Sequence, residues 1–254
     1  MKLAPRLQAM LKHLKEHGYT SIDTFVEKFS VTPQTVRRDL NQLEQAGLIQ
    51  RFHGGAELQS NTVNTEYSSR LSQNQTAKET IAKKVAQMIP DGASLFINIG
   101  TTTEVVAQHL KTHKQLQIVT NNIHVAANLS GKEDFSVIIA GGEVRHSDGG
   151  IIGEATSDFI KQFQMDFAII GISGISEDGA LLDFDFKEVK VSQAILDNAS
   201  TIILVADNSK FGRRAMVKQG DLAQIDIFIT DAQPPAPLLD IIKEHNIELH
   251  VVTP

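Results

Sequence analysis

The sequence predicts an α/β protein in two parts: a small helical N-terminal part and a larger C-terminal part built around a mostly parallel sheet. The chain has 254 residues, 41% of them hydrophobic, which is enough for two domains and a sizeable core. Before residue 57 the apolar residues repeat at helical spacing. After residue 94, short apolar runs alternate with amphipathic segments, a pattern typical of strands buried on both faces with helices between them.

The two parts differ in charge. Residues 1–56 carry eight Lys and Arg against five Asp and Glu, whereas the whole chain has a net charge of −6. A basic module beside an acidic body indicates that the N-terminal part meets a polyanion such as DNA. The chain has no cysteine, which excludes disulfides, thiolate metal sites and cysteine nucleophiles. No apolar run approaches about 18 residues, so we expect a soluble cytoplasmic protein with no membrane partner.

Two short amphipathic helices are predicted first. One covers residues 5–17 and ends at Gly18, and the other begins after Ser21, which is a good N-cap. Their inward faces are formed by Leu7, Met10, Leu11, Leu14, Phe25, Val26 and Phe29.

A third helix begins at a well-marked position. Thr32 can accept a hydrogen bond from a first-turn N–H, and Pro33 suits the first helical position, where its missing donor costs nothing. Val36, Leu40 and Leu43 then form one apolar stripe. The opposite face is polar and carries arginine and amide side chains, which match the major-groove edges of guanine and adenine. Taken alone, this helix could equally be an ordinary solvated one.

The segment after the third helix decides between these alternatives. Residues 48–56 are typical of a strand, a glycine turn and a return strand, the wing of a winged helix-turn-helix domain. The candidate DNA-contacting residues are Thr32, Gln34, Thr35, Arg37, Arg38, Asn41, Arg51 and His53. Asp39 would be repelled by phosphate, so we expect it to be a structural partner for an arginine or a backbone group.

The remaining chain divides into a linker and an α/β domain. Residues 58–75 are polar and rich in Ser, Asn and Gln, which predicts an exposed linker between domains at 1–57 and 76–254. Strands are expected at 95–99, 117–119, 137–140, 167–170, 202–206, 227–229 and 249–252. Helices are expected at 76–88, 104–110, 124–129, 154–163, 188–198 and 238–244.

Small, hydroxyl-bearing, amide and cationic residues follow the predicted strands. In open α/β sheets, ligands bind at the carboxyl ends of the strands. The segment 100–103 leads into a helix, whose positive end suits a phosphate, and Lys210 adds a positive charge. Asn121 and Asn122 can bond hydroxyl groups, so we expect a small phosphorylated polyol or sugar. The candidate residues are Gly100, Thr101, Thr102, Thr103, Thr120, Asn121, Asn122, Gly141, Gly142, Arg145, Gly171 and Lys210.

Two further groups of side chains carry weaker signals. His109 and His113 are spaced to share a helix face, but no third metal ligand accompanies them, so no metal site is predicted. Asp183, Asp185 and Glu188 could supply an acid and a base for sugar-phosphate isomerisation, although a loop leading into a helix explains them equally well.

Six stretches of the chain together resemble one protein family. They are residues 31–40 (VTPQTVRRDL), 51–56 (RFHGGA), 99–102 (IGTT), 119–122 (VTNN), 140–142 (AGG) and 207–212 (DNSKFG). They are similar to the DNA-binding signature and the sensor domain of the DeoR family of bacterial transcriptional repressors, over nearly the whole chain. The resemblance implies a sensor domain similar in fold to ribose-phosphate isomerases, with no cofactor and no catalytic residues.

Residues 149–156 and 171–175 are especially similar to family members that respond to glycerol 3-phosphate, which implies that ligand as the effector. One position departs from the family pattern, because Asn98 stands where an aspartate is usual. The resemblance implies a repressor of a carbon-catabolic regulon that binds double-stranded operator DNA as a homo-oligomer, a dimer or a tetramer, and is released by the metabolite. Two alternatives stay open: an isomerase-like enzyme carrying a DNA-binding module, and a DNA-binding protein whose α/β domain serves only assembly.

Overall fold

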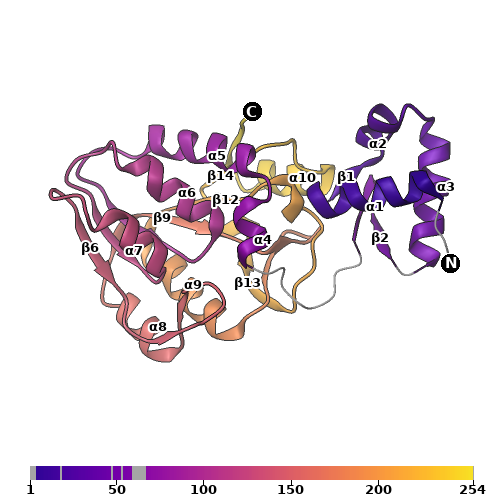
Figure 1. The fold of residues 1–254 in the computed structure, drawn as a ribbon. Coiled ribbons are helices and arrows are strands. Elements are labelled where there is room, and N and C mark those ends of the chain that lie inside the picture. The colour runs from indigo at the N-terminus through magenta and orange to yellow at the C-terminus, as the bar shows by residue number, and fades with distance from the viewer. Residues whose placement is uncertain (1–3, 18, 47, 53, 59–66, 254) are drawn as a thin grey trace.

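The computed structural model describes residues 4–17, 19–46, 48–52, 54–58 and 67–253. A small N-terminal domain lies beside a larger α/β domain, and the two have separate hydrophobic clusters (Figure 1). Within the described residues, no helix is long and apolar enough to cross a lipid bilayer.

The N-terminal domain is a winged helix-turn-helix, as predicted. Its helices are α1 (Pro5–His17), α2 (Ile22–Phe29) and α3 (Pro33–Gln45), and its strands are β1 (Thr20–Ser21), β2 (Ile49–Phe52) and β3 (Gly55–Leu58). The strands form an antiparallel sheet in the order β1-β3-β2. Ser30 ends α2 in the left-handed conformation, which turns the chain toward α3. The core contains Leu7, Met10, Leu14, Ile22, Phe25, Val36, Leu40, Leu43, Ile49 and Ala56.

The larger domain is built on a seven-stranded sheet in which every neighbouring pair is parallel. The strand order is β15-β14-β12-β9-β4-β5-β6, and all seven strands coincide with predicted ones. They are β4 (Ser94–Ile97), β5 (Gln117–Thr120), β6 (Ser136–Ile139), β9 (Met165–Gly171), β12 (Ala199–Val205), β14 (Ile227–Thr230) and β15 (Glu248–Val251).

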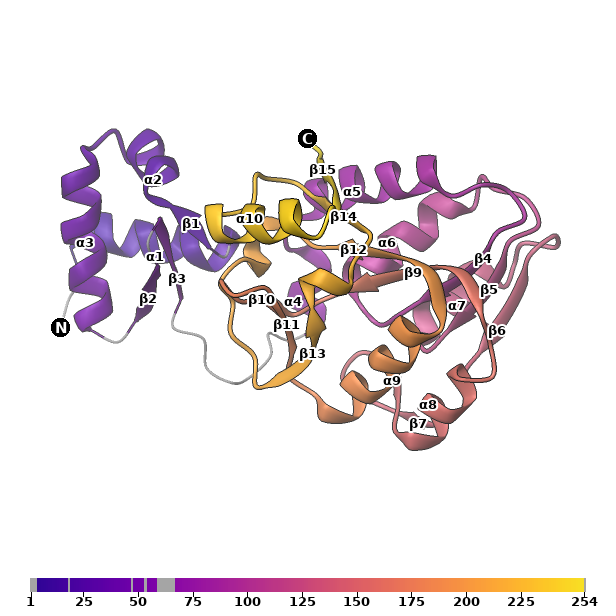
Figure 2. The same cartoon turned by 180° about the vertical axis from the view of Figure 1, so that it is seen from behind.

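Helices cover both faces of this sheet (Figures 1 and 2). One face packs on α5 (Gln75–Met88), α6 (Thr101–Leu110) and α7 (Ile123–Leu129). The other packs on α8 (Glu154–Ile160), α9 (Phe186–Asp197) and α10 (Ala236–Glu244). Alternation along a strand explains the continuous apolar runs: Ile169 enters the first cluster, and its neighbours Ala168 and Ile170 enter the second.

Several short elements lie where the sequence predicted loops. A second antiparallel sheet contains β10 (Gly174–Ile175), β11 (Ala180–Asp183) and β13 (Val217–Asp221), and a hairpin pairs β7 (Glu143–Val144) with β8 (Ile151–Ile152). Two single-turn helices cover Asn208–Lys210 and Leu222–Gln224. Helix α4 (Tyr67–Ser72) falls inside the predicted linker, so that range is not irregular throughout. These elements are too short to impose a clear periodicity.

Candidate nucleic-acid interface and anion-binding cavity

Helix α3 has the N-cap and the two faces that the sequence predicts. The Thr35 backbone N–H donates to Thr32 Oγ1 at 3.2 Å. Val36, Leu40 and Leu43 are completely buried. Along the opposite side Gln34, Thr35, Arg37, Arg38 and Asn41 are exposed or half-buried. The packing of one face thus leaves the polar face available to a groove.

Asp39 lies on the buried side of α3 and pairs with an arginine. Arg6 of α1 donates from Nε to Asp39 Oδ2 at 2.6 Å and from Nη2 to Oδ1 at 3.1 Å. This bidentate geometry fixes α1 against α3. The carboxylate is therefore occupied inside the domain, as predicted for a residue without a base contact.

The wing is attached to α3 by Arg51 of β2. Its Nη1 donates to Asn41 Oδ1, and its backbone N–H donates to Glu44 Oε1 at 3.3 Å. Two predicted DNA-contacting residues, Arg51 and Asn41, are thus brought together at the junction of helix and wing. His53, the other predicted wing contact, lies outside the described residues.

The second candidate site is a cavity at the carboxyl ends of β4 and β9. Its volume is about 30 Å³, far below the roughly 300 Å³ of a typical small-molecule pocket. A phosphorylated ligand therefore requires side chains to move. The lining residues are Arg70, Ile99, Gly100, Thr101, Thr102, Arg145, Gly171, Ile172, Ser173, Asp183, Glu188, Lys210 and Arg213.

One wall of the cavity is the N-terminus of α6. Gly100 is the N-cap and supplies no capping side chain, and Thr101 and Thr102 open the first turn. Thr103 Oγ1 bonds both the Asn98 and the Gly100 carbonyl oxygens at 2.8 Å. This side chain holds the loop, and the first-turn N–H groups and the positive end of the helix dipole are suited to bind an anion.

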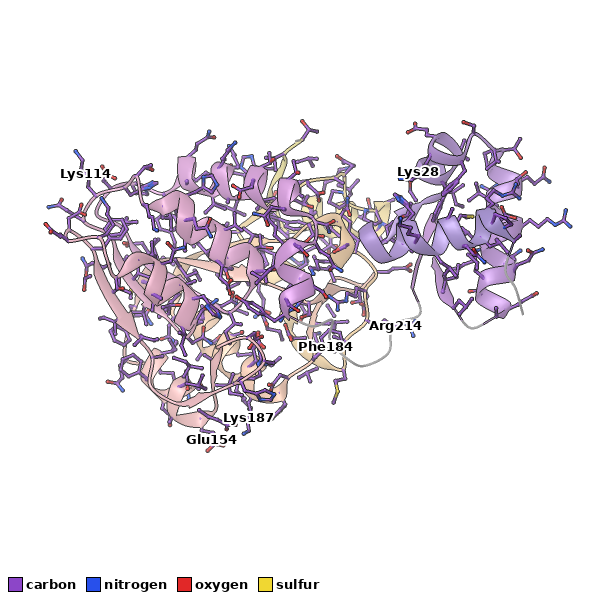
Figure 3. All side chains as sticks on the ribbon, in the orientation of Figure 1. Lys28, Lys114, Glu154, Phe184, Lys187 and Arg214 are labelled. Carbon is purple, nitrogen blue, oxygen red and sulfur yellow. The ribbon has the colours of Figure 1, made fainter. Side chains whose placement is uncertain are left out.

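Arg145 is clamped by three carboxylates at the opposite wall. It bonds Asp148 twice at 2.8 Å, Asp185 at 2.7 Å and Glu188 at 2.6 Å. Burial opposes its charge, but the bonds to these carboxylates raise the pKa of Arg145 above its ordinary value. Arg145 is therefore a fixed positive charge. In Figure 3, Phe184 and Lys187 mark the chain around the start of α9, from which two of these acids come.

Two titratable groups of the cavity have pKa values near neutrality. Burial lowers the pKa of Lys210 to about 8, against the attraction of Asp207. Burial and the charge of Asp183 raise the pKa of Glu188 to about 8, against the pull of Arg145. Burial also raises the pKa of Asp183. The charge of the cavity thus depends on pH within the physiological range.

Two family models match the chain, and together they span both domains. The model for a DeoR-like helix-turn-helix domain matches residues 6–62. The model for a DeoR C-terminal sensor domain matches residues 73–232. The chain belongs to the DeoR family.

Named relatives match this DeoR-family chain along its length. The glycerol-3-phosphate regulon repressor of Escherichia coli (strain K12) is 51% identical over 251 residues, which are 99% of this chain and 100% of that protein. The glycerol-3-phosphate regulon repressor of Haemophilus influenzae is 46% identical over 249 residues, 98% of this chain and 97% of that protein. Ribose 5-phosphate isomerase A of Methanocaldococcus jannaschii is 14% identical and covers 55% of each chain with a TM-score of 0.41, which carries no argument about activity.

In this DeoR-family chain, half of the predicted effector residues line the cavity and half are not among its lining residues. The lining ones are Gly100, Thr101, Thr102, Arg145, Gly171 and Lys210. The others are Thr103, Thr120, Asn121, Asn122, Gly141 and Gly142. The cause is visible in their bonds: Thr120 Oγ1 donates to Ile97 O at 2.6 Å, and Asn122 caps α7. The residues at the end of β5 therefore support the fold.

Asn98, the departure from the family pattern, is a structural residue. Its Oδ1 accepts from the Gly171 N–H at 2.9 Å, and its Nδ2 donates to the Gly171 carbonyl at 3.5 Å. An amide can fill both roles, whereas an ionised carboxylate has no donor. Asn98 thus ties the ends of β4 and β9 together beneath the cavity.

The cavity also contains residues that the sequence did not predict as effector ligands. Arg213 follows the single-turn helix and donates to Ser173 O at 3.2 Å. Asp183 and Glu188, which the sequence presented only as a possible acid and base, also line the cavity: Glu188 pairs with Arg145, and Asp183 accepts from the Phe184 N–H. Arg70 comes from α4, where the polar composition indicated only a linker. A Tyr-x-x-Arg spacing inside that polar run was the one available signal.

The two histidines of α6 and the following turn do not converge on a common point. His109 Nε2 lies 2.6 Å from Glu79 Oε2. His113 Nε2 lies 3.0 Å from the carbonyl oxygens of Ala86 and Ile89. Both side chains thus have structural partners on or next to α5.

Proposed function

We propose that the chain is a transcriptional repressor of a carbon-catabolic regulon. It binds operator DNA through α3 and the wing, and it is released from the DNA when glycerol 3-phosphate occupies the cavity. The observation that carries the proposal is 51% identity to a glycerol-3-phosphate regulon repressor along both domains. We infer a cytoplasmic location, because a repressor works where the DNA is.

The cavity chemistry supports a small phosphorylated polyol. Its phosphate would bond the first-turn N–H groups of α6 and the Lys210 ammonium, an arrangement suited to a dianion. Hydroxyl groups would bond the carboxyls of Asp183 and Glu188, which are acceptors when ionised and donors when protonated. Glycerol 3-phosphate has both kinds of group within a short molecule.

On the DNA side, the polar face of α3 would enter the major groove and Arg51 would lie near the backbone. We assign the contacts to Thr32, Gln34, Thr35, Arg37, Arg38, Asn41, Arg51 and His53. Paired half-sites require two such helices, so we infer a homo-oligomer, a dimer or a tetramer.

An isomerase function is not supported. The relatives that match the whole chain are named as repressors. Of the three carboxyls that could act as an acid and a base, Asp183, Asp185 and Glu188, the last two are bonded to Arg145. Structural pairing with a buried arginine accounts for Asp185 and Glu188 without turnover.

The direct test uses a duplex that the protein itself selects from a random pool of sequences. Fluorescence anisotropy then measures release of this duplex by glycerol 3-phosphate, with glycerol, inorganic phosphate and several sugar phosphates as comparisons. We expect glycerol 3-phosphate to release the duplex at the lowest concentration. Release by none of these compounds would overturn the effector assignment. Failure to select any duplex would overturn the assignment of the chain as a repressor.

Variants of the cavity separate DNA binding from sensing. Thr101→Val and Lys210→Gln remove a hydroxyl and a charge from the proposed phosphate site. We expect both to bind the selected duplex with unchanged affinity but to need more glycerol 3-phosphate for release. If both variants respond like the unmodified chain, the effector does not bind in this cavity.

A further inference from the structure

Helix α4, which connects the two domains in sequence, is attached to the wall of the cavity. We propose that Arg70 of α4 is a phosphate ligand that couples occupancy of the cavity to the DNA-binding domain: it exchanges Asp148 for the effector phosphate and shifts α4 as it does so. This inference rests on the proposed function and adds how occupancy of the cavity affects the DNA-binding domain.

The side chains that attach α4 to the α/β domain reach groups at or beside the cavity. Tyr67 Oη donates to Glu104 Oε2 at 2.8 Å, and Glu104 is in the first turn of α6. Arg70 Nη2 donates to Asp148 Oδ2 at 3.2 Å, and Asp148 is also bonded to Arg145. A phosphate that enters the cavity therefore alters the charge next to both carboxylates.

The turn after α4 is tied to the cavity in the same way. Asn74 Nδ2 donates to Asp207 Oδ1 at 2.8 Å, and Asp207 is the charge that faces Lys210. Lys78 Nζ donates to the Arg70 carbonyl oxygen and fixes the end of α4 on α5. The segment from Tyr67 to Lys78 thus rests on the groups that would bind the effector.

Arg70 is held less firmly than Arg145 and can change partner. Within the described residues Arg145 has three carboxylate partners, whereas Arg70 has one ion pair, at 3.2 Å, and its buried Nε has no hydrogen-bond partner. The Arg70 side chain lines the cavity and is 17% exposed. A phosphate offers this guanidinium two parallel bonds, which is the geometry that arginine favours.

The position of α4 in the chain gives this exchange a consequence. Strand β3 of the wing ends at Leu58, and α4 begins at Tyr67. Only eight residues separate the two in sequence, so α4 is the first described element of the larger part of the chain after the DNA-binding domain. A shift of α4 therefore moves the point from which that domain is attached. A ligand shifts such an equilibrium only through contacts that differ between the two states, and the Arg70 partner is such a contact.

The test compares Arg70→Gln with Lys83→Gln in the full chain. Lys83 is an exposed cation on α5, so its variant loses the same charge away from the cavity. Calorimetry measures binding of glycerol 3-phosphate and of inorganic phosphate, and anisotropy measures release of the selected duplex. We expect Arg70→Gln to lower the affinity for glycerol 3-phosphate and for inorganic phosphate by about tenfold or more, because charge-assisted bonds are lost. We also expect it to retain the duplex at saturating effector, with Lys83→Gln unchanged.

A third variant isolates the coupling step. Tyr67→Phe removes the bond to Glu104 but leaves the lining residues in place, so we expect effector affinity within about threefold of the unmodified chain and incomplete release at saturation. Arg70→Lys should recover part of the phosphate binding, because lysine keeps the positive charge but lacks the two parallel donors of the guanidinium.

The outcomes separate this inference from the proposed function. If the unmodified chain neither binds nor responds to glycerol 3-phosphate, the proposed effector is wrong. The role of Arg70 as a phosphate ligand is then tested by comparing inorganic phosphate binding in the unmodified chain and in Arg70→Gln. If the unmodified chain responds and Arg70→Gln binds and releases equally well, the role of Arg70 is overturned. Weaker binding by Arg70→Gln with complete release at saturation would overturn the coupling.

Discussion

Individual charged residues in this protein are fixed by their partners, and the partners decide which of them can act on a ligand. Asp39 is occupied by Arg6 inside the N-terminal domain, and Arg145 is occupied by carboxylates inside the larger one. Lys210 differs, because burial lowers its pKa to about 8 and Asp207 only partly compensates. Its charge is therefore available to a phosphate and depends on pH.

This dependence predicts that effector affinity falls as pH rises from 7 to 9. Lys210 is charged below about 8 and neutral above it, and Glu188 becomes negative over the same range, so both changes disfavour a phosphate. The phosphate itself stays dianionic there, since its second pKa is about 6. Loss of one required proton lowers affinity by about tenfold per pH unit above the pKa. Calorimetry at each pH measures the slope, and Lys210→Arg should make it shallower because arginine stays charged and only the contribution of Glu188 remains. An equally steep slope in that variant would contradict the assignment.

A second residue-scale prediction concerns α3. Arg37→Ala or Arg38→Ala should weaken binding to the selected duplex by about 1 to 3 kcal/mol if the arginine makes a bidentate base contact. Lys28→Ala is the matched control, because Lys28 is an exposed cation of α2 in the same domain (Figure 3). Anisotropy against the selected duplex and a scrambled one gives the specificity ratio. An unchanged ratio in both arginine variants would remove them from base recognition.

At the scale of elements, short segments are placed by what they pack against. Strand β1 has only two residues and exists because β3 pairs with it. Helix α4 has six residues and is held by its bonds to the α/β domain. Isolated pieces of this length are not stable in water, so tertiary contacts must hold them.

The close contact between β1 and β3 leaves no room for a side chain at Gly55. A Cβ at this position would lie 2.3 Å from the Thr20 carbonyl oxygen, so the strands would have to separate. We expect Gly55→Ala to destabilise the N-terminal domain by about 1 to 3 kcal/mol and to weaken DNA binding. Gly131→Ala is the control, because its Cβ would meet nothing within 4 Å. Urea unfolding followed by circular dichroism measures the difference, and equal stability of the two variants would count against this geometry.

The whole molecule joins a DNA-binding domain to a sensor domain, so the two ligands must affect each other equally. If effector binding lowers operator affinity by the roughly 5 to 150-fold typical of allosteric proteins, operator binding must lower effector affinity by the same factor. Calorimetric titration of glycerol 3-phosphate into free and duplex-bound protein measures this factor independently of anisotropy. Equal affinity of free and duplex-bound protein for glycerol 3-phosphate would mean that the effector does not act by releasing the operator.

The sequence by itself determined the elements whose signals are local. The cap and apolar stripe of α3, the seven buried strands and the start of α6 each follow from residue type and spacing. The family followed from motifs in both domains, and matches over residues 6–62 and 73–232 agree with it. These features are determined within a few neighbouring residues, which is why periodicity and capping chemistry predict them.

Only the tertiary structure decided which of these residues meet at the cavity. The cavity is lined by residues that follow β4, β9 and β12 and by Arg145 after β6, whereas Thr120 and Asn122 at the end of β5 bond the fold itself. Arg70 is 75 residues before Arg145 in the chain, yet both bond Asp148. The polar composition of residues 58–75 does not indicate which part of the sensor domain they contact, because an ion pair forms wherever the fold brings opposite charges together. The sensor domain supplies that surface to α4, and the cavity is complete only when α4 rests on it.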